Sequence, residues 1–319
     1  MKTCICVLLL ALALPSVFSF AYLHPGSLMF PYGPAHKDVT TEKVDDGGTP
    51  QISTSHSFKF YGEVFRHFFI NNNGAISFKH PVTEYTPDVF PIKKHCMICP
   101  FWADVDNEDA ESGEIYYRQT SEKAIMDRVD ELVNQHFKYL NYSCVWALVV
   151  TWDEVHYHGS ESDRTNTFQC ILASDEKQRS VVIFIYHKIQ WTTGTASGGD
   201  PKSGLGGYAA QAGFNTENTY FNMPFSRTDH ILNIISTSNI NKPGVWMFRV
   251  DAFEAPGGCQ HKDSFMNFGD TMWEDKDCNQ KCVCKPDGKV QCVNQQCAEG
   301  FVCVPLGRNF RCQENEEDC

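Results

Sequence analysis

Nine of the 15 cysteines of this chain lie within its last 61 residues. They are Cys259, Cys278, Cys282, Cys284, Cys292, Cys297, Cys303, Cys312 and Cys319. A segment with so much cysteine has room for few large apolar side chains, and it is typical of a small module held together by disulfides. Because disulfides persist in oxidising compartments, the pattern predicts an extracellular protein.

The first residues predict a secretory leader. Lys2 supplies a positive charge, and an apolar stretch follows from Ile5 to Leu14. This stretch is shorter than the roughly 20 residues that a membrane-spanning helix needs. We expect a signal peptide over residues 1–19, cleaved after Ser19, with cleavage after Ala21 as the near alternative. The sequence thus predicts a secreted protein without a membrane anchor.

The formal net charge of −12 argues against two classes of partner. Nucleic acids and anionic membrane surfaces attract basic proteins, whereas this chain is acidic. Basic proteins and divalent cations remain compatible with the charge. The length of 319 residues leaves room for two domains, one of them large enough to bury an extended core.

The composition divides the chain into regions. Residues 20–56 contain four prolines and a cluster of turn formers, which predict an extended N-terminal segment with few core residues. Residues 57–252 contain short β-type runs. Among them, Val181–Tyr186 is apolar on both faces and is expected at the centre of a sandwich. Residues 259–319 form the cysteine-rich module.

One helix is expected within the β-rich domain. Between Ser121 and Phe137 apolar residues recur at helical spacing, and Thr120 or Ser121 can cap the start. We expect the apolar stripe of this helix to pack on a sheet. The predicted fold class is therefore mainly β: a β-sandwich-like domain with one packed helix, followed by a small disulfide-rich module.

The sequence lacks the motifs of common enzyme classes. The serine within Gly194–Gly198 stands one place too late for the nucleophile turn of hydrolases, and no HExxH zinc motif is present. The glycine-rich stretch Gly194–Gly207 lacks phosphate-binding spacing and is expected to form a mobile surface loop. We therefore predict that the protein is not an enzyme and has no catalytic or cofactor-binding residue.

A run of carboxylates provides the metal candidates. Asp104, Asp106 and Glu108 begin this run, and calcium favours clustered carboxylates on a flexible loop. The spacing does not fit an EF-hand, and a solvated acidic turn is the alternative interpretation. His156 and His158 could begin a zinc site, although a pair of exposed strand histidines is the favoured interpretation.

Four further cysteines, Cys96, Cys99, Cys144 and Cys170, lie in the β-rich domain. In an extracellular chain we expect them in disulfides, and the sequence leaves all three connectivities open. The first eight cysteines of the tail can pair among themselves. That pairing would leave Cys319 for an intermolecular disulfide, and thus for a disulfide-linked oligomer.

One N-glycosylation acceptor is present. Asn141-Tyr142-Ser143 matches the acceptor pattern and lies between the expected helix and the next strand, where a surface turn is expected. The sequence therefore predicts a glycoprotein with its glycan on Asn141.

Five motifs in chain order resemble the nidogen-like (NIDO) extracellular domain. They are Tyr32-Gly33 with Asp45-Asp46-Gly47, Asn72-Asn73-Gly74 with Ile76-Ser77-Phe78, Pro100 to Asp106, Gly113 to Arg118, and Gln211 to Asn215. The resemblance covers about residues 28–252. Around Trp273 and the cysteines that follow it, the tail is similar to von Willebrand type C and trypsin-inhibitor-like modules.

The order of these two modules resembles the amino-terminal part of alpha-tectorin-like chains. Such chains continue into further von Willebrand and zona pellucida modules, whereas this sequence ends at Cys319. The resemblance implies a secreted, non-catalytic protein of the extracellular matrix, either structural or adhesive. Its implied partners are matrix proteins or glycans. A soluble lectin-like recognition factor, or a protease inhibitor acting through the cysteine-rich module, are the alternatives.

Overall fold

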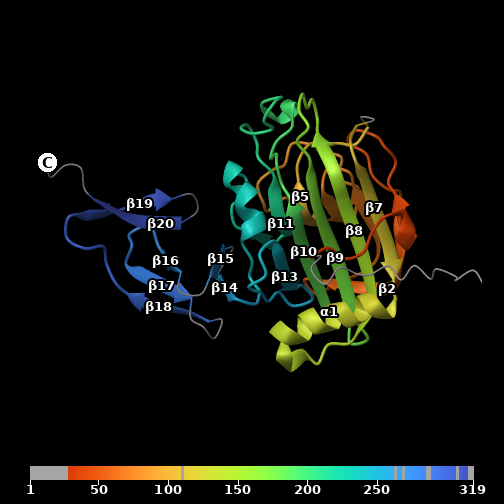
Figure 1. Ribbon diagram of the computed structural model, residues 1–319. Helices are drawn as coiled ribbons and strands as arrows, with labels where there is room; N and C mark the ends of the chain where they lie inside the picture. Colours follow the sequence, from red (N-terminus) through yellow and green to blue (C-terminus); the bar gives the residue numbers. More distant parts are fainter. Residues whose placement is uncertain are drawn as a thin grey trace, which may run out of the picture.

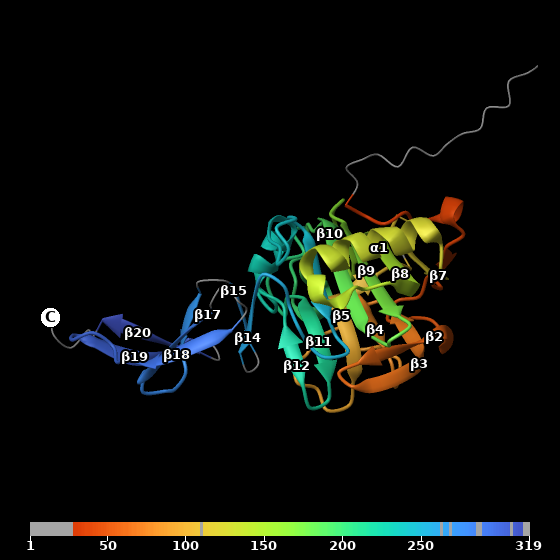
Figure 2. The same cartoon turned by 90° about the horizontal axis from the view of Figure 1, so that it is seen from below.

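The computed structural model describes residues 28–108, 111–261, 264–267, 270–284, 289–306 and 309–314. Two β-sheets face each other in the larger part of the chain, and the strands of the tail lie to one side of them (Figures 1 and 2). The predicted signal peptide over residues 1–19 and the predicted intermolecular Cys319 lie outside the described residues.

The first sheet has the strand order β1-β7-β8-β9-β10-β13, and β6 pairs with β8. Its strands are β1 (Val39–Thr40), β6 (Val105–Asp106), β7 (Glu114–Thr120), β8 (Cys144–Tyr157), β9 (Asn166–Asp175), β10 (Ser180–Lys188) and β13 (Val245–Arg249). All these pairs are antiparallel. The predicted central run Val181–Tyr186 lies in β10, between β9 and β13, and is buried throughout.

The second sheet has the strand order β12-β11-β5-β4-β3-β2. Its strands are β2 (Ile52–Phe60), β3 (Glu63–Asn71), β4 (Ala75–Ser77), β5 (Cys96–Trp102), β11 (Gln211–Thr216) and β12 (Tyr220–Asn222). The turn between β3 and β4 ends at Gly74, whose φ is 82°. A Cβ at Gly74 would lie 1.9 Å from the carbonyl oxygen of Phe101, so only glycine fits there.

Helix α1 (Lys123–His136) covers the face of the first sheet that points away from the second sheet (Figure 2). Its buried residues Ile125, Val129 and Val133 form one stripe along the helix. The prediction of the helix and of its packing is confirmed, whereas the predicted cap by Thr120 or Ser121 is wrong. The N-cap residue is Glu122, whose side chain makes no capping bond, and Thr120 Oγ1 instead accepts the N–H of Glu122 at 3.0 Å.

The first sheet is covered by the second sheet on one face and by α1 on the other, which explains why β10 has apolar residues on both faces. Val182 and Phe184 belong to the core between the two sheets, whereas Val181 and Ile183 belong to the core under α1. Alternate residues of a strand point to opposite faces, so a strand without polar positions needs two covers. Each fully buried side chain of this size stabilises the fold by about 1.5–3 kcal/mol.

Residues 28–56 are part of the domain. Phe30 is fully buried, and its N–H donates to Oε1 of Gln169 at 2.7 Å. The Tyr32 hydroxyl donates to Asp153 at 2.9 Å. The prediction of few core residues in this segment is therefore corrected at Met29 and Phe30. Both side chains pack into the core between α1 and the first sheet.

The glycine-rich stretch Gly194–Gly207 is not the free surface loop that was predicted. The N–H of Thr195 donates to the carbonyl of His158 at 2.9 Å, and the N–H of Tyr208 donates to that of Ser197 at 3.0 Å. Short 3-10 helices complete the domain: η1 (Pro34–His36), η2 (Lys138–Leu140), η3 (Thr195–Ser197) and η4 (Asp229–Ser236).

The tail consists of small antiparallel sheets joined by disulfides. Its strands are β14 (Gly258–His261), β15 (Ser264–Asn267), β16 (Thr271–Trp273), β17 (Gln280–Cys284), β18 (Val290–Asn294), β19 (Phe301–Leu306) and β20 (Asn309–Glu314). Its four disulfides are Cys259–Cys284, Cys278–Cys303, Cys282–Cys292 and Cys297–Cys312. The prediction that the first eight tail cysteines pair among themselves is confirmed.

The predicted disulfides of the β-rich domain are wrong, because Cys96, Cys99, Cys144 and Cys170 are buried thiols. Strand geometry gives the reason. Cys96 and Cys99 are three residues apart on β5, so they point to opposite faces. Cys96 and Cys170 lie in the core between the sheets, Cys99 lies on the outer face of the second sheet, and Cys144 lies in the helix-side core.

Candidate functional site

Four carboxylates and one imidazole meet at one end of the sandwich. We call Asp45, Asp46, Asp104, Asp106 and His158 the acidic cluster. One ligand atom from each of Asp45, Asp46 and Asp104 lies within 4.8 Å of the other two, and the same holds for Asp45, Asp106 and His158. Asp45 and Asp46 come from the turn before β2. Asp104 lies in the β5–β6 connection, Asp106 ends β6, and His158 follows β8.

Two buried asparagines hold these segments together. Asn72 donates through Nδ2 to the carbonyls of Glu42 and Val44, at 3.1 and 2.9 Å, and thereby fixes the turn that carries Asp45. Asn73 donates to Asp46 Oδ1 at 2.8 Å and accepts the N–H of Val105 at 2.9 Å. The Asn72-Asn73-Gly74 turn therefore joins two motifs that are about 60 residues apart in the sequence.

Asp104 is the most buried member of the acidic cluster. This residue is 2% exposed, and its Oδ2 has no hydrogen-bond partner among the described residues. Gly194 makes room for it, since a Cβ there would lie 2.3 Å from Oδ2. Burial raises the pKa of Asp104 to about 7; His158 lowers this pKa, and the charges of Asp45 and Asp46 raise it.

His158 is the basic group that faces these carboxylates. Its Nδ1 lies 3.1 Å from Asp45 Oδ2 and 3.9 Å from Asp106 Oδ2. These are ion-pair distances only while the imidazole is protonated. Its backbone N–H donates to the carbonyl of Asp104 at 3.0 Å, which holds the two residues side by side. Burial raises the pKa of Asp45 too, and His158 lowers it again.

The structure brings together two of the three calcium candidates from the sequence. Asp104 and Asp106 lie in the acidic cluster, whereas Glu108 is exposed and outside it; its N–H donates to Asp106 Oδ1 at 2.9 Å. Sequence reasoning missed Asp45 and Asp46, although their Asp-Asp-Gly turn had been noted. Only the packing of the turn against β6 reveals that they join Asp104.

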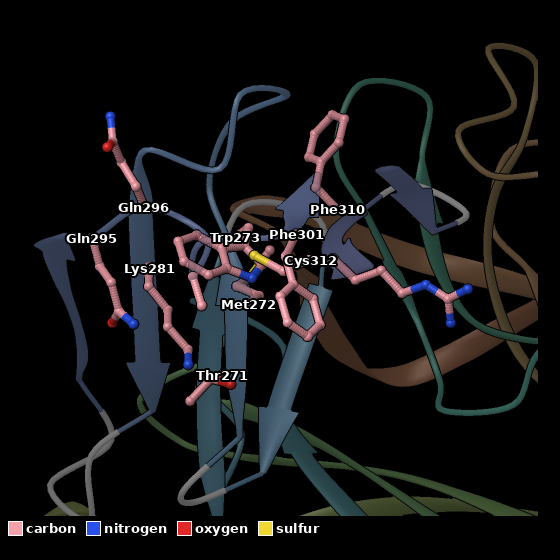
Figure 3. A pocket seen from close by; sticks show the side chains of 11 residues that line it. Thr271, Met272, Trp273, Lys281, Gln295, Gln296, Phe301, Phe310 and Cys312 are labelled. Atoms are coloured by element: carbon pink, nitrogen blue, oxygen red, sulfur yellow. The ribbon is translucent and has the colours of Figure 1, made fainter. Parts of the chain in front are cut away.

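A second feature is a surface hollow in the tail, of about 470 Å³, which we call the tail hollow. It lies between strands β16 and β17 on one side and the β19–β20 hairpin on the other (Figure 3). Trp273 lines it beside Lys281, whose Nζ lies 5.5 Å from the indole ring centroid. Phe301, which is 44% exposed, contributes an apolar wall.

The predicted glycosylation residue is accessible. Asn141 is exposed, and so is Ser143 of the same acceptor sequence. Asn141 has a positive φ of 45°, at the turn between η2 and β8. Glycosylation of Asn141 itself remains a prediction. Among the described residues, no helix is long and apolar enough to cross a membrane.

Comparison with known proteins agrees with this architecture. The model of the nidogen-like domain family matches residues 66–252. Human alpha-tectorin is 42% identical over 300 residues, which cover 92% of this chain and 14% of that protein. No solved structure matches the chain.

Nidogens are more distant relatives. Nidogen of Drosophila melanogaster is 29% identical over 264 residues, covering 81% of this chain and 19% of that protein. Human nidogen-1 is 28% identical over 263 residues, which cover 78% of this chain and 21% of that protein. The chain therefore spans about a seventh to a fifth of the length of these relatives. The match of its sandwich to the family model over residues 66–252 shows that the chain belongs to the nidogen-like domain family.

Proposed function

We propose that this protein is a non-catalytic structural or adhesion component of the extracellular matrix. The chain is extracellular, like the alpha-tectorin and nidogen relatives, which are secreted matrix proteins. The observation that carries the proposal is the extent of the alpha-tectorin match. At 300 residues it is longer than the nidogen-like domain, so it includes the tail as well.

The form of the two modules supports a binding role. The sandwich is filled by apolar side chains, with Trp152, Trp191 and Trp246 all buried between the sheets, so the domain is a rigid support. The small tail also has apolar side chains at its surface, namely Val293, Phe301 and Val302 at 42–48% exposure. Exposed apolar side chains beside polar ones are typical of protein-binding surfaces.

The tail hollow is the surface that we assign to a partner matrix protein. Trp273 and Phe301 provide aromatic area, and the cationic side chains of Lys281 and Arg311 also line it. Aromatic and arginine side chains contribute most of the free energy of binding in protein interfaces. Basic groups here also let an acidic protein bind acidic matrix partners without repulsion at the contact.

The experiment is co-sedimentation of the secreted full-length protein with insoluble extracellular matrix from cultured cells. Wild type is expected in the pellet. Phe301→Ser should reduce the bound fraction about tenfold, because it removes an exposed aromatic anchor worth about 1–2 kcal/mol. Phe225→Ser is the matched control: Phe225 is 38% exposed but lies in the domain, so binding should be unchanged.

Other outcomes would contradict the proposal. If the wild-type protein stayed entirely in the supernatant, the proposed matrix role would be contradicted. Elution of the protein from a sugar column would favour a lectin-like factor. Inhibition of a serine protease by the full-length protein, lost on changes in the tail, would favour an inhibitor.

A further inference from the structure

The acidic cluster contains more negative charge than the protein compensates. Asp45 and Asp106 lie within ion-pair distance of His158, and the charges that act on Asp104 come from His158 on one side and from Asp45, Asp46 and Asp106 on the other. The nearby cation Lys43 is engaged elsewhere, because its Nζ lies 3.2 Å from Glu114 Oε1. Among the described residues, the cluster therefore lacks a counter-charge equal to its own.

Asp104 gives an independent reason to expect a ligand. Its side chain is buried, and its Oδ2 has no hydrogen-bond partner among the described residues. Oδ1 of Asp45 is also buried and without such a partner. A buried polar oxygen without a partner destabilises a fold, and a buried charge without one does so more strongly. An unsatisfied buried oxygen of this kind calls for an explanation, and a bound ion or water supplies one.

We propose that Asp45, Asp46, Asp104 and Asp106 bind one calcium ion, which ties the turn before β2 to β6 and to the connection that precedes β6. Calcium binds oxygen ligands at about 2.3–2.6 Å, so two of its ligands lie at most about 5 Å apart. The carboxylate oxygens of Asp45, Asp46 and Asp104 meet this condition, with mutual distances within 4.8 Å. The site does not depend on the matrix role, and the failure of either proposal leaves the other standing.

The ligand set favours calcium over the other common divalent ions. All four ligands are hard carboxylate oxygens. Asp45, Asp46 and Asp104 lie on a turn or connection, and Asp106 ends the two-residue strand β6, which suits the flexible coordination of calcium. Magnesium requires a near-ideal octahedron and keeps several waters. Zinc would take His158 as a ligand, because imidazole and carboxylates together form typical zinc sites. In the calcium site His158 is not a ligand. Its ion pair with Asp45 is replaced by the bond between Asp45 and the metal.

The test measures calcium binding and thermal unfolding of the full-length secreted protein after treatment with a chelator. After calcium chloride is added, the calcium ion should bind, and the melting temperature of the domain should rise. Asp104→Asn and Asp45→Asn should each weaken calcium binding by at least tenfold and remove the rise. Glu108→Gln is the matched control, because Glu108 lies just after β6 and outside the acidic cluster, and it should leave binding unchanged.

A second readout separates a lost ligand from a damaged fold. Without calcium, Asp104→Asn should melt at or above the temperature of the wild type, because it removes a buried carboxylate that lacks a counter-ion. A lower melting temperature for calcium-free Asp104→Asn would contradict the proposal.

His158→Gln separates calcium from zinc. It should keep calcium binding, since it removes only a competing cation. The proposal is overturned if calcium does not bind, if Asp104→Asn and Asp45→Asn bind it as wild type does, or if zinc binds more tightly and His158→Gln abolishes that binding.

Discussion

In the nidogen-like domain four cysteines are buried as thiols, whereas in the tail eight cysteines form four disulfides. The domain has two extensive apolar cores, one on each face of the first sheet. Among its described residues, the tail has one small apolar cluster, with Met266 beside the Cys259–Cys284 disulfide. The same residue type is thus a small apolar core residue in one region and a cross-link in the other.

Burial explains how thiols persist in an extracellular protein. Desolvation raises the pKa of Cys96 and Cys144 to about 12, and raises the pKa values of Cys99 and Cys170 well above the ordinary value. The thiolate is the form that reacts with oxidants and disulfides. A cysteine that is both inaccessible and protonated is therefore protected without pairing.

The largest expected effect comes from reduction. Dithiothreitol under native conditions should open the tail disulfides and unfold the tail, because each one contributes about 2–4 kcal/mol and the tail has little apolar core. The domain should keep its fold. Limited proteolysis with mass spectrometry checks this: cleavage should appear within residues 259–319 and not within 66–252. If the domain and the tail both unfolded on reduction, the contrast between an apolar core and disulfides would be contradicted.

A smaller effect is expected from a core substitution in the domain. Phe184 is fully buried, and its ring centroid lies 5.5 Å from that of Phe214. Phe184→Ala should lower the free energy of unfolding by about 3–5 kcal/mol, because it leaves a cavity between the sheets. Denaturant unfolding followed by tryptophan fluorescence measures it. Val64→Ala, at a 44% exposed position, is the control and should change little.

The smallest effect tests the role of a single thiol. Cys144 lies in the helix-side core, and Cys144→Ala should cost only about 1 kcal/mol, the value of one small buried apolar group. A loss of 3 kcal/mol or more in the same denaturant experiment would show that Cys144 stabilises the domain as half of a disulfide.

Local sequence patterns were enough to predict part of this fold. The helix between Ser121 and Phe137 has a helical periodicity of apolar residues, and the central run Val181–Tyr186 is continuously apolar. Each of these patterns is carried by its own segment. The tail disulfides could be foreseen as a set, because cysteine density alone excludes an ordinary core. Their connectivity could not, since it depends on how β17 pairs with β18 and how β19 pairs with β20.

The cysteines of the domain show why the remainder was missed. The segment Cys96–Trp102 had not been assigned to a strand, so the opposite directions of Cys96 and Cys99 were not apparent. The acidic cluster depends on long-range packing in the same way. Asp45 meets Asp104 because Asn72 and Asn73 bind both segments, and no local pattern connects residues so far apart.

The central claim, that an apolar core holds the domain whereas disulfides hold the tail, is tested most directly by mapping thiols in the secreted protein. The unreduced protein is denatured, alkylated, digested and analysed by mass spectrometry. Cys96, Cys99, Cys144 and Cys170 should all carry the alkyl group, and none should do so before denaturation. The eight tail cysteines from Cys259 to Cys312 should appear only in the four disulfide-linked pairs described above. Disulfide-linked peptides that contain any of the four domain cysteines would contradict the account.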